Sequence, residues 1–454
     1  MLYDKTPQYP HFAHLPFAKE PFKAIYVFQR IITTVLLVPI WILVNLPRSR
    51  RPRQSWSLRQ IIFVNFTRRI YRVTEVAGVT WGTRNPEEEP GPKELKETVF
   101  EWAPPLKESL RKGVVLDRFG RVPFKRAGCF KQIPVIGIFF HGGGYSQLSA
   151  HEKSRTSHIP RRLMKNNLFT EIYAVEYRLL QHAPLPAVIM DAAAAYSHVV
   201  DKYYGSNFAS KPCKIILLGD SSGGNLALAL ARWIRDEQVL PTPDGLLLFS
   251  PSCDASHAFP STDSSYIPRP HASTDYLTDT PEPRALMQRT FLGFKYRPGG
   301  TGWGQWKRGR SREGREIEEE TRSLMEIIHS EYVSPASPRV LRRWGHIVDL
   351  YDGSRLGDPT PKADSSPDTF TPRNPAHSYP SRYPQFHTLF AQFPKTFILI
   401  GDAERLTTEV GNLARAMGKD FHDVFMIPPG WWDERIKSEV WEDVKVWMRG
   451  FHEQ

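Results

Sequence analysis

The chain contains a serine flanked by glycines in the stretch GDSSGG. Gly219, Ser221 and Gly223 end a strand-like apolar run, CKIILLGD at 213–220, and begin a helix-like stretch at 222–237. A serine in such a strand-to-helix turn exposes its hydroxyl, and the two glycines leave room for the adjoining helix and strand. The N-terminus of the helix adds positive potential beside the hydroxyl. This pattern predicts a nucleophilic serine at position 221.

Three consecutive glycines follow another strand-like run in FFHGGGY, residues 139–145. Inside a regular element each glycine costs roughly 0.5–1 kcal/mol against alanine, so the close approach of a ligand explains them better than stability does. When a serine attacks an ester, the carbonyl oxygen becomes an anion that backbone N–H groups about 3 Å away stabilise. We expect Gly142, Gly143 and Ser222 to supply these donors. A phosphate-binding loop would need a Lys followed by Ser or Thr, which this stretch lacks.

Short apolar runs alternate with helix-like stretches from about residue 134 onward. The runs occupy 134–140, 172–177, 213–220, 245–251, 395–402 and 423–429, and the last four end in Asp or Pro. Continuous apolar strands separated by helices are typical of a parallel sheet that is covered on both faces. We therefore predict an α/β fold with a mostly parallel, doubly wound sheet. Ligands bind such sheets at the carboxyl ends of the strands.

Several motifs together resemble the hormone-sensitive-lipase-like branch of the α/β-hydrolase fold, with its esterases and arylacetamide-deacetylase relatives. They are HGGGY, VEYRLLQHAPLPAVIMDAAAAY (175–196) and GDSSGGNLALAL (219–230). The resemblance covers about 130–300 and 326–427, and the N-terminal segment is similar to that of fungal members. It implies a carboxylic-ester hydrolase, without cofactor or metal, that forms an acyl-serine on Ser221. The implied substrates are small to medium uncharged acyl or acetyl esters.

The resemblance also implies roles for the neighbours of the two glycine motifs. The family's catalytic carboxylate lies in a D-x-L triplet after the seventh strand. The matching triplet here begins at Glu404, which is the predicted acid, with Asp402 as the alternative. A glutamate can orient an imidazole as an aspartate does. His141 would hold the glycine loop, and the remaining motif residues support the site: Gly144, Gly219, Asp220 and Gly223.

A serine, a carboxylate and a histidine that acts as general base together form the catalytic triad of such enzymes. The sequence does not supply this histidine at the expected place. The loop after the last predicted strand, 423–427, reads PPGWWDER and contains no histidine. His422 precedes that strand, which predicts a position at the opposite edge of the sheet from Ser221. His452, beyond a predicted helix over 434–450, is the remaining candidate base. Three hypotheses stay open: an impaired homologue that binds a small apolar ligand, a sequence that lacks part of this loop, or a His452 that reaches the site.

The N-terminal region carries most of the excess positive charge. Residues 1–60 hold nine basic and two acidic side chains, which is +7 of the net +12. These charges flank an uncharged run over 31–46, extended upstream by AIYVF. The run approaches the ~20 residues that cross a bilayer, so we expect a membrane helix over 24–46. We expect a single-pass protein of the endoplasmic reticulum membrane, and the alternative is a peripheral membrane anchor.

The orientation of that predicted helix stays open. The basic residues around it favour a cytosolic catalytic part, whereas a glycosylated Asn65-Phe66-Thr67 sequon would favour the reverse. The next stretch, 57–76, has apolar residues at helical spacing with arginines between them. It predicts an amphipathic helix that covers the pocket or lies on a membrane.

Composition also divides the chain. We expect a tail (1–23), the membrane helix (24–46), a cap and linker (47–130), a core in two parts (131–296 and 326–454), a charged insertion (297–325) and an irregular loop (346–382). Glutamates interleave with the arginines of the insertion, and no aromatic stacking platform accompanies them, so we expect no nucleic-acid partner. The three cysteines show no CxxC or zinc spacing, which favours buried thiols. The oligomeric state is left open.

Overall fold

A computed structural model describes most of the chain. The described residues are 15, 17–91, 93–106, 114–120, 133–205, 213–260, 266–271, 273–277, 281–292, 312–356, 388–401, 404–418, 421–422 and 434–452. The strands are β1 (Thr98–Ala103), β2 (Val114–Phe119), β3 (Val135–Phe140), β4 (Glu171–Glu176), β5 (Lys214–Asp220), β6 (Gly245–Phe249), β7 (Val348–Asp349), β8 (Arg355–Leu356), β9 (Lys395–Leu399) and β10 (Phe421–His422).

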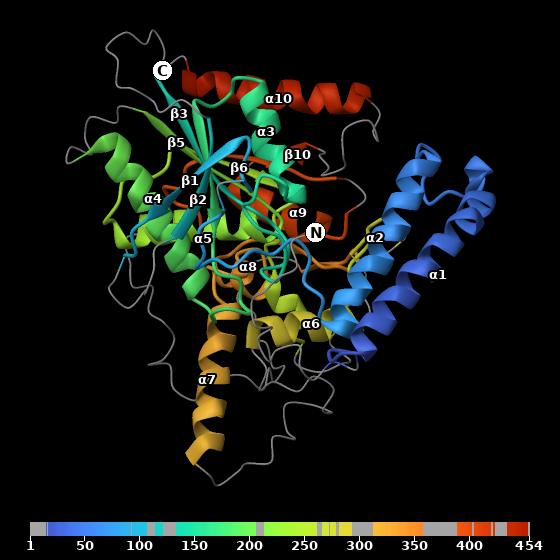
Figure 1. Ribbon diagram of the computed structural model, residues 1–454. Coiled ribbons are helices and arrows are strands. Elements are labelled where there is room, and N and C mark those ends of the chain that lie inside the picture. The colour runs from blue at the N-terminus through green and yellow to red at the C-terminus, as the bar shows by residue number, and fades with distance from the viewer. Residues whose placement is uncertain are drawn as a thin grey trace.

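Helices alternate with the strands from β3 onward, as the sequence predicts. They are α1 (Phe22–Asn45), α2 (Leu58–Ala77), α3 (His158–Lys165), α4 (Ala187–Tyr204), α5 (Ser222–Glu237), α6 (Pro281–Leu292), α7 (Arg312–Ile328), α8 (Pro338–Arg343), α9 (Thr407–Met417) and α10 (Glu434–His452). Short 3₁₀ turns lie at Arg48–Arg50, Arg155–Ser157 and Ala255–Ala258. Figure 1 shows the helices arranged around the central sheet.

Eight strands of the described residues form the main sheet in the order β1-β2-β4-β3-β5-β6-β9-β10. From β4 to β10 all neighbours pair in parallel, whereas the β1–β2 and β2–β4 pairs are antiparallel, so β2 alone among these described strands runs against the others. The central strands β3, β4 and β6 are buried along their whole length. Their continuous apolar sequences satisfy a sheet that is covered on both faces. The α/β-hydrolase-type fold predicted from the sequence is thus confirmed.

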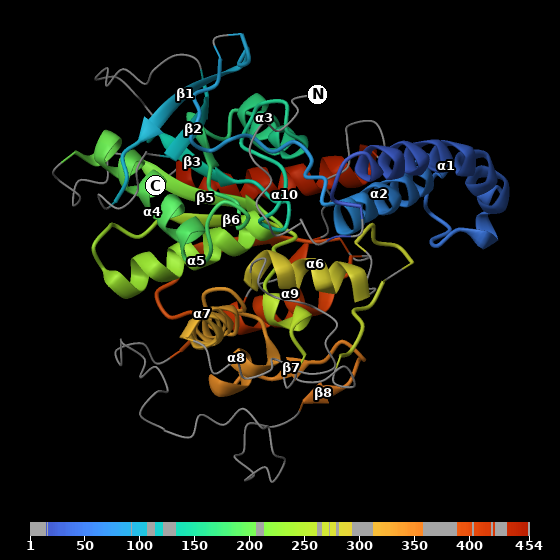
Figure 2. The same ribbon diagram turned by 60° about the horizontal axis from the view of Figure 1, so that its bottom comes forward.

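Two apolar clusters fill the layers on either side of the sheet. One side of β3 (Ile136, Ile138) packs against α4 and α5, with α9 beyond them. The other side (Val135, Phe139) packs against α3 and α10. Figure 2 shows α4 and α5 on the side of the sheet away from α3 and α10. The core thus holds the carboxyl ends of β3, β5 and β6 in fixed register.

Part of the predicted charged insertion is helical. Residues 312–328 form α7, and Leu324 and Ile328 are buried in the core cluster that includes α6. Composition alone predicted a solvated insertion over 297–325; the apolar positions at the end of the stretch anchor its last turns instead. Residues 346–356 of the predicted irregular loop contain the β7–β8 pair, and the rest of that loop lies outside the described residues.

The two described cysteines, Cys213 and Cys253, are free and buried. This confirms the expected state for both, and Cys129 lies outside the described residues.

Candidate active site

Ser221 occupies a strained turn between the end of β5 and the start of α5. Its backbone has φ 51° and ψ −119°, a combination that residues with a side chain rarely adopt. Neighbouring backbone groups hold it there: its N–H donates to the Phe249 carbonyl at 2.9 Å, and its carbonyl accepts from Ser252 N–H at 3.0 Å. Strain of this kind persists only where the surroundings impose it, and it is common at nucleophilic residues.

The flanking glycines are required by close packing. A Cβ on Gly219 would collide with the carbonyl of Gly223 one helical turn away. A Cβ on Gly223 would collide with the carbonyls of Phe140 and His141 at the end of β3. The turn at Ser221 therefore depends on glycine at both positions because backbone, rather than a movable side chain, fills the space.

The glycine loop lies beside Ser221 because β3 and β5 are neighbours in register. Phe140 pairs with Gly219, so the residues two positions later in each strand are level with each other. The Gly142 N–H donates to Asp220 Oδ1 at 2.9 Å, and the Tyr145 N–H donates to Ser222 Oγ at 3.3 Å. The loop is thus bonded to the residue before Ser221 and to the residue after it.

The Gly142 amide does not serve the role that the sequence predicted. Its N–H is used by the Asp220 carboxylate, and a Cβ on Gly142 would collide with Asp220 Oδ2, so this glycine is needed for packing. Within the described chain, no hydrogen bond occupies the amides of Gly143, Gly144 and Ser222. These three amides are therefore the unoccupied donors beside Ser221.

Buried aromatic side chains hold the loop in this position. The His141 ring stacks on Tyr177, with centroids 4.3 Å apart and planes at 10°, and its Nδ1 lies 2.8 Å from the Gly142 carbonyl. Burial lowers the pKa of His141 to about 4, so the ring is neutral at pH 7. The Tyr145 hydroxyl donates to Asn225 Oδ1 on α5 at 2.7 Å. His141 is thus positioned to support the loop.

Asp220 is a buried carboxyl next to the serine. It is fully buried, and desolvation raises its pKa to about 7 despite the hydrogen bond from Gly142. Its Oδ2 has no hydrogen-bond partner among the described residues. Burial therefore favours the protonated form of this carboxyl.

The predicted acid, Glu404, lies at the same edge of the sheet as Ser221. It sits on the turn between β9 and α9, and its Oε1 accepts hydrogen bonds from Ser250 Oγ at 2.9 Å and from Gly401 N–H at 3.0 Å. Ser250 directly follows β6, the strand next to β5. Asp402, the alternative acid, lies outside the described residues.

The structure does not bring His452 to this edge. Its Nε2 lies 3.3 Å from the Leu168 carbonyl, which precedes the amino end of β4. Five residues of strand at about 3.3 Å each separate that end from the edge where Ser221 lies. Among the described residues, no histidine side chain is hydrogen-bonded to the Ser221 hydroxyl.

The predicted position of His422 is wrong in register. His422 is part of β10 and pairs with Leu399, which is level with Phe249 and Asp220, so it lies at the carboxyl half of the sheet. The strand begins before the apolar run 423–427, which itself lies outside the described residues. β10 is three strand spacings, about 14 Å, from β5.

Helix α2 covers the site through an irregular segment that the sequence did not single out. Arg68 Nε donates to the Asp275 carbonyl at 2.6 Å, and Tyr71 stacks on Tyr276 with centroids 5.6 Å apart. The Asp275 carboxylate in turn accepts the Arg405 N–H at 2.7 Å, next to Glu404. Asp275 therefore links the cap helix to the turn that carries the acid. No spacing or motif in the sequence indicated it.

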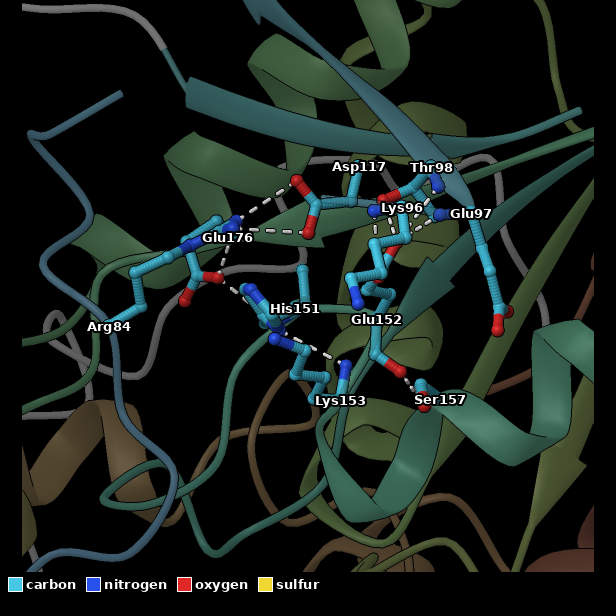
Figure 3. A network of polar contacts seen from close by, with 11 residues as sticks. Arg84, Lys96, Glu97, Thr98, Asp117, His151, Glu152, Lys153, Ser157 and Glu176 are labelled. Atoms are coloured by element: carbon cyan, nitrogen blue, oxygen red, sulfur yellow. Dashed lines mark hydrogen bonds and ion pairs between the residues drawn. The ribbon is translucent and has the colours of Figure 1, made fainter. Parts of the chain in front are cut away.

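A buried ionic network supports the segment after the glycine loop (Figure 3). Arg84 bonds Asp117 on β2 at 3.1 Å and Glu176 on β4 at 2.9 Å. Glu176 also accepts the Ala150 N–H at 3.0 Å. Glu152 accepts three successive N–H groups from residues 96–98. These bonds fix residues 150–152 against the sheet.

The described residues contain no group of three or more His, Cys, Asp or Glu side chains arranged to hold a metal ion.

One described helix, α1, is long and apolar enough to cross a membrane, with a mean hydropathy of 2.1 over its most apolar window.

Comparison with known proteins finds similar sequences and a matching family model. Residues 137–293 match the family model described as alpha/beta hydrolase fold. Human arylacetamide deacetylase-like 2 is 33% identical over 100 residues, which are 22% of this chain and 24% of that protein. Carboxylic ester hydrolase LipN of Mycobacterium tuberculosis is 30% identical over 122 residues, 26% of this chain and 31% of that protein. The aligned segments thus span about a quarter to a third of these relatives.

A solved bacterial heroin esterase is similar in structure at 16% sequence identity. The alignment covers 79% of this chain and 87% of that one, with a TM-score of 0.46.

Proposed function

We propose that this chain is an α/β-hydrolase of the hormone-sensitive-lipase-like branch and a serine hydrolase of carboxylic esters. One observation carries the proposal. Ser221 is held in a strained turn, and the glycine loop is bonded to the residues on both sides of it. Such a turn presents a hydroxyl and several free amides to the same reacting carbonyl.

In the proposed reaction the Ser221 oxygen attacks the carbonyl carbon of the ester. The carbonyl oxygen becomes negative, and the amides of Gly143, Gly144 and Ser222 stabilise it together with the N-terminus of α5. The proton of the hydroxyl passes by way of a base to the departing alcohol, which leaves an acyl-serine. Water then attacks that acyl group, returns a proton to Ser221 and releases the acid. Glu404 is the proposed carboxylate that orients the base.

The proposed substrates are small to medium uncharged acyl or acetyl esters. Tyr71 of the cap helix α2 stacks on Tyr276 beside Asp275 and the Glu404 turn, and this pair suits contact with an apolar or aromatic group. The names of the relatives, an arylacetamide deacetylase-like protein and a carboxylic ester hydrolase, agree with that class. We also propose that α1 attaches the protein to a membrane, that of the endoplasmic reticulum.

A second candidate function is favoured by one observation, the absence of a histidine between His422 and His452 in the sequence. An α/β-hydrolase without a placed base keeps its pocket and loses most of its turnover, because removal of the histidine from a triad costs roughly 10⁶-fold. Such a protein would bind a small apolar ester or alcohol without hydrolysing it.

Hydrolysis of p-nitrophenyl acetate and labelling by a fluorophosphonate probe distinguish the two functions. We expect the wild-type protein to do both, and Ser221→Ala to lose labelling and at least roughly 10⁴-fold in kcat. Ser252→Ala is the matched control, because Ser252 contacts Ser221 through its backbone N–H. A wild-type protein that neither turns over the ester nor reacts with the probe would support the binding function instead.

A further inference from the structure

Helices α1 and α2 form an antiparallel pair, the N-terminal hairpin (residues 22–77), at one side of the molecule. Figures 1 and 2 both show the two helices side by side, away from the sheet. Helix α2 is fixed to the core, since it contacts α6 and bonds Asp275 through Arg68. Any position of α1 relative to a membrane therefore determines the position of α2 and the core as well.

The hairpin is closed where it meets the core. The Phe17 N–H donates to the Val76 carbonyl at 3.3 Å, and the Phe17 ring stacks on Tyr26 of α1 with centroids 4.9 Å apart. Leu15 is buried as well. The chain that enters α1 thus lies beside the chain that leaves α2. A helix that crosses a bilayer once would separate these two segments by the thickness of the hydrocarbon, about 30 Å.

The hairpin is also closed at its other end. Arg51 donates to the Asn45 carbonyl at 3.0 Å and to the Trp56 carbonyl at 2.7 Å, which ties the end of α1 to the approach to α2. Ser57 caps α2 through a reciprocal pair of hydrogen bonds with Gln60. The chain therefore reverses within 46–57, and α2 returns along α1 to the core.

The seam between the helices is polar halfway along α1. Arg69 Nε donates to Thr34 Oγ1 and Arg69 Nη2 to Thr33 Oγ1, both at 2.9 Å. Arg30 Nε lies 3.4 Å from the Arg69 carbonyl. If α1 spanned a bilayer with these contacts intact, α2 and both guanidinium groups would enter the hydrocarbon, where charged side chains are strongly disfavoured.

The outer face of α1 is apolar and carries no charge. Phe28, Leu36 and Leu43 are 67%, 66% and 69% exposed, and the other large exposed side chains of the helix are Phe22, Ile25, Ile31, Ile32, Val35, Ile40 and Val44. No exposed residue of α1 is charged. Arg48 and Arg50 are exposed at the reversal beyond it, and Arg59 is exposed in the first turn of α2. An apolar stripe next to exposed arginines fits the boundary between acyl chains and anionic headgroups.

We propose that the N-terminal hairpin is a monotopic anchor: α1 lies in the plane of a bilayer, with its outer face about 5–10 Å deep at the boundary between headgroups and acyl chains. The chain before α1 and the hydrolase core then lie on the same side of the membrane. This rests on the proposed membrane attachment and replaces the single-pass helix expected from the sequence. The partner is a lipid surface that contains anionic headgroups.

Accessibility of the two ends of the full-length chain tests the geometry. The protein carries one epitope tag before residue 1 and a different tag after residue 454, and it is expressed in microsomes that are then treated with protease. An in-plane anchor leaves both tags on one side, so both are digested or both are protected. Digestion of one tag with protection of the other would show a single-pass span and overturn the proposal.

Flotation with liposomes tests the surface. We expect the full-length protein to float with vesicles of phosphatidylcholine and phosphatidylserine, and Leu36→Glu to reduce the bound fraction at least tenfold. Val239→Glu, which changes a 60% exposed apolar residue outside the hairpin, is the matched control and should bind within twofold of wild type. Equal binding of the two variants would overturn the proposed surface. Failure of the wild-type protein to float would instead contradict the proposed membrane attachment itself, whether or not the protein self-associates through α1.

Discussion

At the scale of single residues, the site is built from backbone groups that approach too closely for any side chain. Gly219, Gly223 and Gly142 each face backbone or carboxylate atoms at distances that a Cβ cannot occupy. Their conformations matter less than their packing, since none of the three has a positive φ. The strained backbone is that of Ser221. It is held by hydrogen bonds to Phe249, the last residue of β6, and to Ser252, which follows that strand.

Gly223→Ala should destabilise the fold severely, because its Cβ would meet the end of β3, which cannot move without disturbing the sheet. We expect a loss of several kcal/mol, on the order of 3 or more, in the free energy of unfolding. Gly450→Ala is the matched control: this glycine also lies in a helix, and a Cβ there meets nothing within 4 Å. It should raise stability by up to about 1 kcal/mol. Urea unfolding of both variants makes the comparison, and equal stabilities would contradict it.

Asp220 should make stability depend on pH. Its pKa is about 7 in the folded chain against 3.8 for an ordinary exposed aspartate, so the folded state binds the extra proton between these values. Its contribution is therefore present below pH 4 and is lost as the pH rises to 7, at no more than about 1.4 kcal/mol per unit. Asp220→Asn keeps an acceptor for Gly142 and removes the titration.

The test is the difference in unfolding free energy between Asp220→Asn and wild type at pH 5, 6 and 7. This difference should become more favourable to the variant as the pH rises. The same comparison for Asp201→Asn, an exposed position on α4, should stay flat. A flat difference for Asp220→Asn as well would show that the carboxyl is ionised throughout.

At the scale of elements, the cap and the acid turn are joined through one short segment. Residues 274–277 bond α2 on one side and the turn at Arg405 on the other. The stacked Tyr71 and Tyr276 add an apolar contact to the same joint. A shift of α2 would therefore reach the Glu404 turn through Asp275.

Arg68→Met should loosen this joint. It removes the 2.6 Å bond to the Asp275 carbonyl and keeps most of the apolar stem, so we expect stability to fall by about 1–2 kcal/mol. KM for p-nitrophenyl esters should rise severalfold, because the pocket wall on α2 is less fixed. Arg59→Met, an exposed position on the same helix, should leave both quantities unchanged. Identical KM values for the two variants would argue against a role for the joint in substrate binding.

At the scale of the whole molecule, the sheet separates the reactive edge from the structural one. Ser221, the glycine loop and Glu404 gather where β3, β5, β6 and β9 end. His452 lies near the start of β4, where α10 passes over the other edge. The N-terminal hairpin extends from the side of the core, so a lipid surface along α1 need not cover the sheet.

His452→Ala should leave kcat and KM for p-nitrophenyl acetate within twofold of wild type, because its contact is with the Leu168 carbonyl at the far edge. Glu404→Gln should lower kcat by roughly 10²–10⁴ if it orients the base. Parallel assays of the two variants decide the point. A large loss of kcat in His452→Ala, with an unchanged melting temperature, would restore His452 as the base.

The sequence by itself determined the features that depend on short spacing. Short continuous apolar runs predicted the central strands, GDSSGG predicted the turn at Ser221, and the uncharged run predicted the apolar helix α1. The reason is local: a strand buried on both faces needs a continuous apolar run, and a tight strand-to-helix turn needs glycine beside the serine.

Only the tertiary structure decided which groups meet across long separations in the chain. In the folded chain the Gly142 amide bonds Asp220, and Asp275 joins α2 to the Glu404 turn. His452 lies at the far edge of the sheet, and the bond between Phe17 and Val76 closes the hairpin. Each of these contacts joins residues between 59 and 284 positions apart or depends on a strand register. The spacing of residue types along the chain carries no such information, because packing of the whole core sets those distances.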